Sequence, residues 1–490
     1  MSGQALALVE KWGRFELKLA CSEEPLAEEQ PYLVCRFTNG LHYGEAEGFP
    51  AEAGSYLIRF MPGEEGIWTY VTQSSCPDMD GISGEFACTA PSPGNRGPVQ
   101  VQDEAHFAYA DGTRYVPLGT VSYAWHLGDE HLLEQTLESL QASPFNKLRM
   151  AVLPGSGQVA FAESAAARDS RAVPSYAAAG ADTGKAWPGP DYFTRLDRLL
   201  ARLDLAGIEA ELVLFQPHTP CAEGLSLEDE ERYVRYCAAR YGAFRNVWWS
   251  LCEEPEAFAG RLPEDWNRLF RVLQEWDCGG HMRSLLSRPE AYDFGVPWVT
   301  HASLKSRDVR IASDLTKAYG KPVILDDCGG EGNLDTDWTG LNAEEMVCRL
   351  WEATARGGFA AYRECYLRPD GTQWQVQGGE LGGVGIQRVA FLSHILESNP
   401  PGMSYNSDRY DAATLEIRGE CYLQYFGPHR FAYRGFDLPE GRYEAELIDT
   451  WNMTITPLPG VWEGRFRIDL PGKLYYALRL RRQAAAEELS

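Results

Sequence analysis

The sequence lacks the short motifs that mark several large enzyme classes. Its 12 cysteines and 9 histidines form no Cys-x-x-Cys pair and no His-Glu-x-x-His motif, so nothing indicates a zinc site. The glycine-rich run at 378–385 has no Lys-Ser or Lys-Thr after it, which argues against phosphate binding. A Gly-x-Ser-x-Gly motif, which would support an acyl hydrolase, is also missing. We therefore expect no metal and no cofactor.

Basic charge and long apolar runs are scarce as well. The 490 residues include 45 basic and 70 acidic side chains, for a net charge of −25, and such a surface repels nucleic acids and anionic membranes. No apolar stretch reaches the length of about 18 residues that a membrane span needs, and residues 1–10 have no signal-peptide pattern. The sequence predicts a cytoplasmic protein without nucleic-acid or membrane partners, which could form a homo-oligomer.

Most cysteines lie inside apolar or strand-like segments, as Cys35, Cys252 and Cys328 do, and this is typical of reduced core thiols. Cys76 and Cys88 flank a turn-rich segment and could pair, but the pattern favours free thiols.

The chain divides into three regions. Residues 1–100 alternate apolar and polar side chains between turn residues, which predicts an N-terminal β-sandwich. In residues 101–402, strand-like runs alternate with amphipathic helices, the pattern of an α/β (β/α)8 TIM barrel. Residues 403–490 return to alternation and predict a small C-terminal β-domain. The loop 155–190 is interpreted as a mobile flap or a disordered segment.

Eight strands are predicted for the barrel, with little room for a helix between the fifth and the sixth. Their ranges are 115–125, 147–154, 209–217, 247–254, 282–287, 298–304, 322–328 and 359–367.

Two carboxylates follow the most apolar strand. The run Val-Trp-Trp-Ser-Leu-Cys ends in Glu253 and Glu254, and active sites of α/β barrels lie at the C-terminal ends of the strands. Glycosidic hydrolysis needs one protonated carboxyl and one ionised carboxylate. We assign the proton donor to Glu254, because apolar surroundings favour its neutral form, and the ionised partner to Asp327, which Arg149 would keep charged. The alternative for either acid is a solvated strand end or a turn cap.

Further residues at the predicted strand ends are candidates for sugar binding. Histidines could donate to hydroxyls or be structural, and Trp374 could stack on a sugar or anchor its loop. The candidate substrate-binding residues are Trp125, Arg149, His218, Glu253, His301, Glu364 and Trp374.

Several segments resemble bacterial multidomain glycoside hydrolases with an apiosidase-like barrel of the clan A type, flanked by β-domains. The resemblance covers nearly the whole chain and rests on residues 9–16, 60–70, 143–150, 244–251, 298–303, 321–327 and 449–454. It implies a TIM-barrel glycosidase acting on carbohydrate, with the fourth-strand glutamate, here Glu254, as the acid/base and the seventh-strand acid, here Asp327, as the nucleophile.

Three departures from the family pattern bear on activity. Glu253 stands where these enzymes usually have Asn, Asp327 stands where they have Glu, and Leu286-Ser287 replaces His-Asn. Misplacing a reacting group by about 1 Å can cost roughly 100-fold in rate. The shorter Asp327 could slow attack, could make room for a water, or could yield its role to Glu331 or Glu364. The sequence thus predicts a glycoside hydrolase and favours a retaining mechanism for it; the alternative is an impaired homologue that binds carbohydrate or acts as a scaffold.

Overall fold

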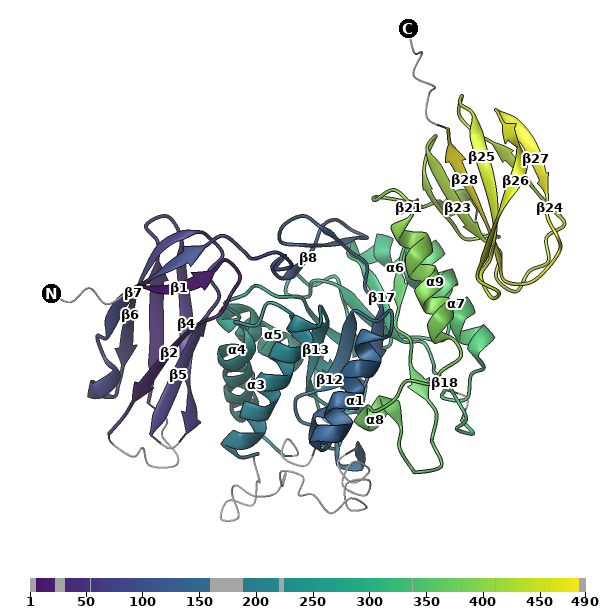
Figure 1. The fold of residues 1–490 in the computed structure, drawn as a ribbon. Helices are drawn as coiled ribbons and strands as arrows, with labels where there is room; N and C mark the ends of the chain where they lie inside the picture. The colour runs from purple at the N-terminus through teal and green to yellow at the C-terminus, as the bar shows by residue number, and fades with distance from the viewer. Residues whose placement is uncertain are drawn as a thin grey trace, which may run out of the picture.

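The computed structural model describes residues 6–22, 31–52, 54–158, 188–219, 224–336, 338–409 and 411–483. Most of the loop 155–190, interpreted above as a flap or a disordered segment, lies outside these residues. No helix in the described part of the chain is long and apolar enough to cross a membrane. Three bodies follow one another along the chain, with the barrel between two β-domains (Figure 1).

The N-terminal domain is a seven-stranded sheet in the order β1-β7-β6-β3-β4-β5-β2. Its core is aromatic: the rings of Phe15 and Phe86 stack at 4.3 Å and those of Phe37 and Phe60 at 4.1 Å. The strands are β1 (Ala7–Glu10), β2 (Phe15–Ala20), β3 (Leu33–Thr38), β4 (Tyr43–Glu52), β5 (Ser55–Phe60), β6 (Gly66–Ser74) and β7 (Ser83–Thr89).

The prediction of free thiols was wrong for one pair of cysteines. Cys76 forms a disulfide with Cys21, not with Cys88, which is buried as a free thiol. The bond joins the end of β2 to the turn after β6, and Cys21 and Cys76 both pack in the aromatic core of this domain.

Eight parallel strands form the predicted barrel in sequence order. A backbone hydrogen bond of 2.8 Å from Tyr362 N to Gly119 O joins the last strand region to the first. The strands are buried on both faces, as all seven residues of β13 show. Each lies within or next to a predicted range: β11 (Gly119–Val121), β12 (Lys147–Ala151), β13 (Glu209–Phe215), β14 (Val247–Glu253), β15 (Arg283–Ser287), β16 (Ala302–Lys305), β17 (Val323–Asp327) and β19 (Phe359–Ala360).

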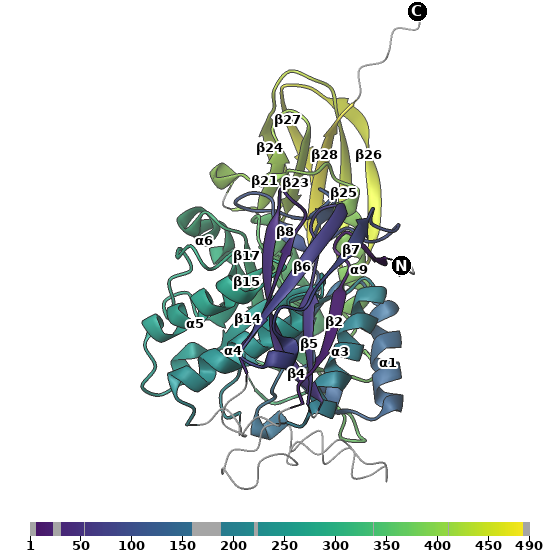
Figure 2. The same ribbon diagram turned by 90° about the vertical axis from the view of Figure 1, so that its left-hand side faces the viewer.

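Amphipathic helices pack around the strands and cover them from solvent (Figures 1 and 2). The side chain of Asp129 caps α1, and a Ser226–Asp229 capping box begins α4, as predicted for that site. Residues 288–301 form no helix, in line with the short fifth connection. The helices are α1 (Glu130–Gln141), α3 (Pro190–Leu205), α4 (Leu227–Tyr241), α5 (Pro263–Trp276), α6 (Ala312–Tyr319), α7 (Ala343–Ala355), α8 (Trp374–Gln377) and α9 (Ile386–Glu397).

A small three-stranded sheet closes the floor of the barrel, the end at which its strands begin. It consists of β8 (Val99–Val101), β9 (Phe107–Tyr109) and β10 (Arg114–Tyr115). Phe107 and Tyr115 of this sheet pack with Trp248 and Ile324 from the barrel strands. The opposite end, the rim, carries the loops and the short pair β18 (Glu331–Gly332) and β20 (Glu364–Cys365).

The C-terminal domain is a six-stranded sheet with a two-stranded ribbon. Its strands alternate buried and exposed residues around a core of Tyr422, Phe436, Tyr443 and Leu480. They are β21 (Ser404–Tyr405), β22 (Thr414–Ile417), β23 (Cys421–Tyr425), β24 (Tyr433–Asp437), β25 (Tyr443–Asp449), β26 (Thr454–Trp462), β27 (Arg465–Asp469) and β28 (Tyr476–Arg482).

The N-terminal domain packs on the helical side of the barrel, against α3 and α4 (Figure 2). One carboxylate organises this joint: Asp197 on α3 pairs at 2.8 Å with Arg59 of β5 and at 2.8 Å with Arg240 of α4. Both guanidinium groups are nearly inaccessible to solvent.

Candidate active site

Two irregularities shape the rim of the barrel. The pairing of β14 with β15 shifts between Ser250 and Glu253, and that of β16 with β17 shifts between Ser303 and Lys305. Bulges of this kind re-aim side chains and are frequent next to active sites. Glu254, directly after β14, has a left-handed backbone with φ of 50°. Such a conformation is uncommon for a residue other than glycine and clusters at functional sites.

The two acids predicted to act together meet at one lysine. Nζ of Lys305, the last residue of β16, is in contact with Oε1 of Glu254 and lies 3.8 Å from Oδ2 of Asp327. The Glu254 side chain is about one-third exposed, at 32%, and that of Asp327 is 5% exposed. The apolar surroundings expected for Glu254 are therefore not found; a cation and solvent surround its carboxylate.

Asp327 is held as an anion by several donors. Burial alone would raise its pKa, but the charge and the hydrogen bond of Arg363 outweigh burial and lower the pKa, with help from Lys305. The indole of Trp338 donates to the same carboxylate at 2.6 Å. Arg149, which the sequence suggested for this role, does not contact Asp327; it binds Glu211 and Ser250 inside the barrel.

Glu253 lies beside this pair, almost fully buried. Its carboxylate accepts hydrogen bonds from the Tyr123 hydroxyl and, at 2.6 Å, from the amide of Gln216. Burial and then the charge of Glu253 raise the pKa of Tyr123 far above its usual value, so the phenol stays a donor. Glu253 thus has protein partners on both oxygens, and its carboxylate faces the barrel interior at the rim.

A cavity of about 860 Å³ reaches Lys305 and Trp338, although neither Glu254 nor Asp327 is among its lining residues. Lys305 and Trp338 line it and also contact Asp327, so they join the cavity to the acid pair. The Lys305 ammonium lies 5.2 Å from the centre of the Trp338 ring. Cations and anions are balanced along the wall, which includes Arg288, Glu290, Arg307, Asp308 and Asp314.

Below the rim lies a second, fully buried set of charges. Nζ of Lys147 contacts Glu211 at 2.5 Å and Asp326 at 2.8 Å, and Arg149 contacts Glu211 at 2.5 Å. These four side chains are at most 1% exposed. Burial lowers the pKa of Lys147, but the charges of Asp326 and Glu211 outweigh it and raise the pKa above the ordinary value. Asp326, the residue before the predicted nucleophile Asp327, is thus a structural anion.

Two predicted sugar-binding residues are enclosed by the core. His301 precedes β16 and so lies at the floor, where its ring packs 5.3 Å from that of Trp248. Burial and the Lys147 charge lower the pKa of His301 to about 3, so it is neutral. Trp125 is buried, and its indole donates to the sulfur of Met150. The core encloses both rings, which for His301 fits the structural alternative.

Two other candidates hold loops in place. Trp374 is fully buried and donates to the Thr120 hydroxyl at 3.1 Å, which fits the loop-anchoring alternative and not sugar stacking. Glu364 is also inaccessible and accepts the backbone N–H groups of Gly382 and Gly383, each at 2.8 Å. Both fasten the glycine-rich segment to the barrel.

Glu331, considered as a replacement nucleophile, is buried in the same way. It accepts from the Tyr362 hydroxyl at 2.6 Å and from the N–H of Val384 at 2.7 Å. His218, at the end of β13, is exposed and has a left-handed backbone with φ of 61°. Of the predicted sugar-binding residues, His218 is the exposed one, and the other six are buried.

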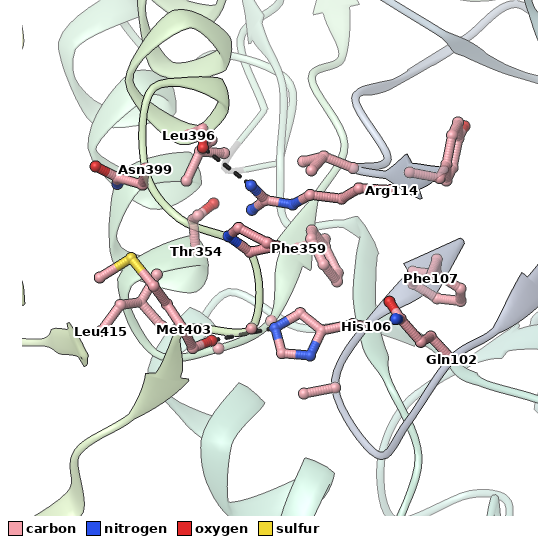
Figure 3. A pocket seen from close by; sticks show the side chains of 17 residues that line it. Gln102, His106, Phe107, Arg114, Thr354, Phe359, Leu396, Asn399, Met403 and Leu415 are labelled. Carbon is pink, nitrogen blue, oxygen red and sulfur yellow. Dashed lines mark hydrogen bonds between the residues drawn. The ribbon is translucent and has the colours of Figure 1, made fainter. Parts of the chain in front are cut away.

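A smaller cavity of about 40 Å³ lies at the opposite end of the barrel (Figure 3). His106 reaches across it to the Met403 carbonyl, and Arg114 donates to the Leu396 carbonyl at 3.1 Å. These contacts tie the floor sheet to the chain that leads into the C-terminal domain. The cavity is far from the acids and has room for water alone.

Sequence reasoning missed Lys305, Arg363 and Trp338. For the eighth strand, Glu364 was chosen as the candidate and its neighbour Arg363 was passed over. Successive residues of a strand point to opposite faces, so only one of the two could reach the mouth of the barrel. Lys305 lies one residue beyond the predicted end of its strand. Trp338 belongs to a loop, and nothing in the sequence connects it to Asp327.

A closed parallel barrel with two carboxylates at its rim belongs to the class of (β/α)8 glycosidases. A model of the family described as "Apiosidase-like, catalytic domain" matches residues 102–360, more than half of the chain. The chain belongs to this family and is a glycosidase. Its flanking regions match two domains of unknown function, DUF5060 over residues 8–75 and DUF5605 over residues 410–481.

Solved structures agree with this assignment. A candidate glycoside hydrolase from Bacteroides vulgatus ATCC 8482 has 31% sequence identity and a TM-score of 0.87 over 97% of this chain and 100% of its own. A family 5 glycoside hydrolase from the same organism, 15% identical, shares the fold with a TM-score of 0.62 over 81% of this chain and 96% of its own. A search of curated proteins found no match to the chain.

Proposed function

We propose that this glycosidase hydrolyses O-glycosidic bonds in small oligosaccharides or glycosides, with Glu254 as the proton donor and Asp327 as the nucleophile. The observation that carries the proposal is the convergence of both carboxylates on one ammonium group at the rim. Asp327 is kept ionised, as a nucleophile must be, and Glu254 is reached by solvent, from which it can take up a proton.

The closeness of the acids supports a retaining mechanism. A single lysine lies in ion-pair range of one oxygen of each carboxylate, which supports a short separation, and retaining enzymes hold their carboxyl groups about 5–5.5 Å apart. The cavity of about 860 Å³ falls in the range of sites for small molecules, which supports short substrates.

Glu254→Gln tests the assignment, with Glu256→Gln as the matched control two residues away. Loss of general acid catalysis should lower kcat/KM about 10²–10⁴-fold for aryl glycosides with poor leaving groups, and less for activated ones, because these need less help from an acid. Glu256 bonds Ser287, and its variant should keep nearly full activity. Equal losses for all leaving groups would remove Glu254 from the acid role. Product analysis by NMR should show retention at the anomeric carbon; inversion would make Asp327 a base.

One observation favours a second candidate, an impaired homologue that binds carbohydrate without cleaving it. In the unliganded protein Lys305 occupies both acids, so neither is free to meet a sugar. Calorimetric binding of sugars combined with no turnover across a broad panel of glycosides would support this reading, and one good substrate would exclude it.

A further inference from the structure

Lys305 is aimed at the acid pair by its strand. The register shift between Ser303 and Lys305 occurs where β16 ends, and it turns the lysine toward the mouth of the barrel. The side chain is 17% exposed, and the ring of Trp338 lies against its ammonium group. A lysine side chain without such contacts would extend into solvent. The bulge and the Trp338 ring together therefore fix the position of the Lys305 ammonium group.

Charge is balanced around this lysine. Two carboxylates, Glu254 and Asp327, face two cations, Lys305 and Arg363, and the four groups are linked by direct contacts. Other charged or titratable groups surround the cluster. Tyr123, which bonds Glu253, and Cys365 act on Arg363, Cys328 lies beside Asp327, and Arg288, Arg307 and Asp308 line the same cavity as Lys305. Adding a proton to Glu254 while Lys305 touches it would place an ammonium beside a neutral acid and leave the cluster with excess positive charge.

We propose that Lys305 is a positioning residue that holds Glu254 beside Asp327 in the unliganded enzyme and releases Glu254 when a glycoside binds. After release, Lys305 stays with Asp327, and Glu254 takes up a proton from solvent and turns to the leaving oxygen. This inference rests on the proposed function, since it assigns a role in the same reaction. It implies that substrate binding must break one ion pair.

The pH profile of kcat/KM tests the release. In Lys305→Met, the alkaline limb, which reports loss of the acid proton, should move up by about 1–3 pH units, because the neighbouring cation is gone. KM should fall because no ion pair opposes binding, while kcat falls because Asp327 loses a partner. Lys305→Arg should restore the wild-type limb, and Lys317→Met, at an exposed site on α6, should change nothing. An unmoved alkaline limb in Lys305→Met, or an equal shift in Lys305→Arg, would overturn the proposal.

A crystal structure of unliganded Lys305→Met gives a test that needs no activity. We expect the Glu254 carboxylate to turn away from Asp327, since Arg363 still pairs with Asp327 but the cation that contacts both carboxylates is gone. If Glu254 keeps its place without Lys305, the lysine does not position it. Lys305→Gln serves in the same way should the methionine variant not fold. If the wild type cleaves no glycoside but Glu254 moves as expected, the proposed function fails while the positioning role stands.

Discussion

The barrel contains two clusters of the same composition at two depths. The interior cluster joins Glu211 and Asp326 to Lys147 and Arg149; the rim cluster, defined by Glu254, Asp327, Lys305 and Arg363, also has two acids, one lysine and one arginine. Interior side chains are at most 1% exposed, whereas Glu254 at the rim is 32% exposed.

The difference in depth separates a structural cluster from a reactive one. A buried ion pair cannot lose one partner without stranding a charge in a medium of low dielectric constant. Solvent at the rim can replace a lost partner, so the contact between Lys305 and Glu254 can open at low cost. The same combination of four charges thus holds strands together in the barrel interior and can rearrange at the rim.

Among the variants that compare the two clusters, Lys147→Met should lower the free energy of unfolding most. It removes the cation from both Glu211 and Asp326, and removing one member of a buried pair typically costs about 3–5 kcal/mol. Urea unfolding followed by tryptophan fluorescence would measure the loss. Glu134→Gln, at an exposed pair with Arg202 on the barrel surface, is the control and should cost less than about 1 kcal/mol. A similar small loss in Lys147→Met would contradict the structural role of the interior cluster.

Glu209 is a buried acid that no cation contacts in the described part of the chain, and burial is the largest influence on its pKa. Burial raises its pKa to about 8, and the Trp248 indole donates to it at 3.0 Å. The neutral acid stabilises the fold fully below the unfolded pKa of about 4.5, and this contribution is lost as the pH rises through about 8. Glu209→Gln, which keeps an acceptor for the indole, should gain about 2–4 kcal/mol over the wild type between pH 5 and pH 8.

Thermal unfolding of both proteins at several pH values in this window would measure that difference. Other titrating groups contribute equally to both and cancel. Parallel pH dependences would show that Glu209 is already ionised in the folded protein.

Lys305→Met should have the smallest effect on stability. Its contact with Glu254 is partly exposed, and such pairs contribute about 0–1 kcal/mol. The free energy of unfolding in urea, measured beside Lys147→Met, compares the same substitution at the two depths. A loss as large as that of Lys147→Met would mean that the rim cluster is structural too.

The barrel could be predicted from the sequence because its strands are buried on both faces. Runs such as Glu209–Phe215 and Val247–Glu253 are mostly apolar and have no face exposed to solvent, which few other structures tolerate. The end of β16 was harder to place, since Ala302–Lys305 is short and the residues before it are equally apolar. Because the strand was predicted to begin too early, His301 at the floor was taken as a candidate residue and Lys305 at the rim was not.

The acids of the site were predictable, but their partners were not. Arg149 pairs with Glu211 because the two lie opposite each other on neighbouring strands and point to the same face. Alternating charges at Lys147 and Arg149 and at Glu209 and Glu211, inside otherwise apolar strands, were a signal for this pairing. The contact of Trp338 with Asp327 depends on how a loop folds back, which periodicity does not encode.

Asp197 has a consequence for how the domains can be separated in evolution. One carboxylate serves Arg59 of the N-terminal domain and Arg240 of the barrel, at a joint that excludes water. A chain without the N-terminal domain would expose Asp197 and Arg240 along with the apolar surface around them. Moving this domain onto another barrel would therefore require matching charges on the new partner.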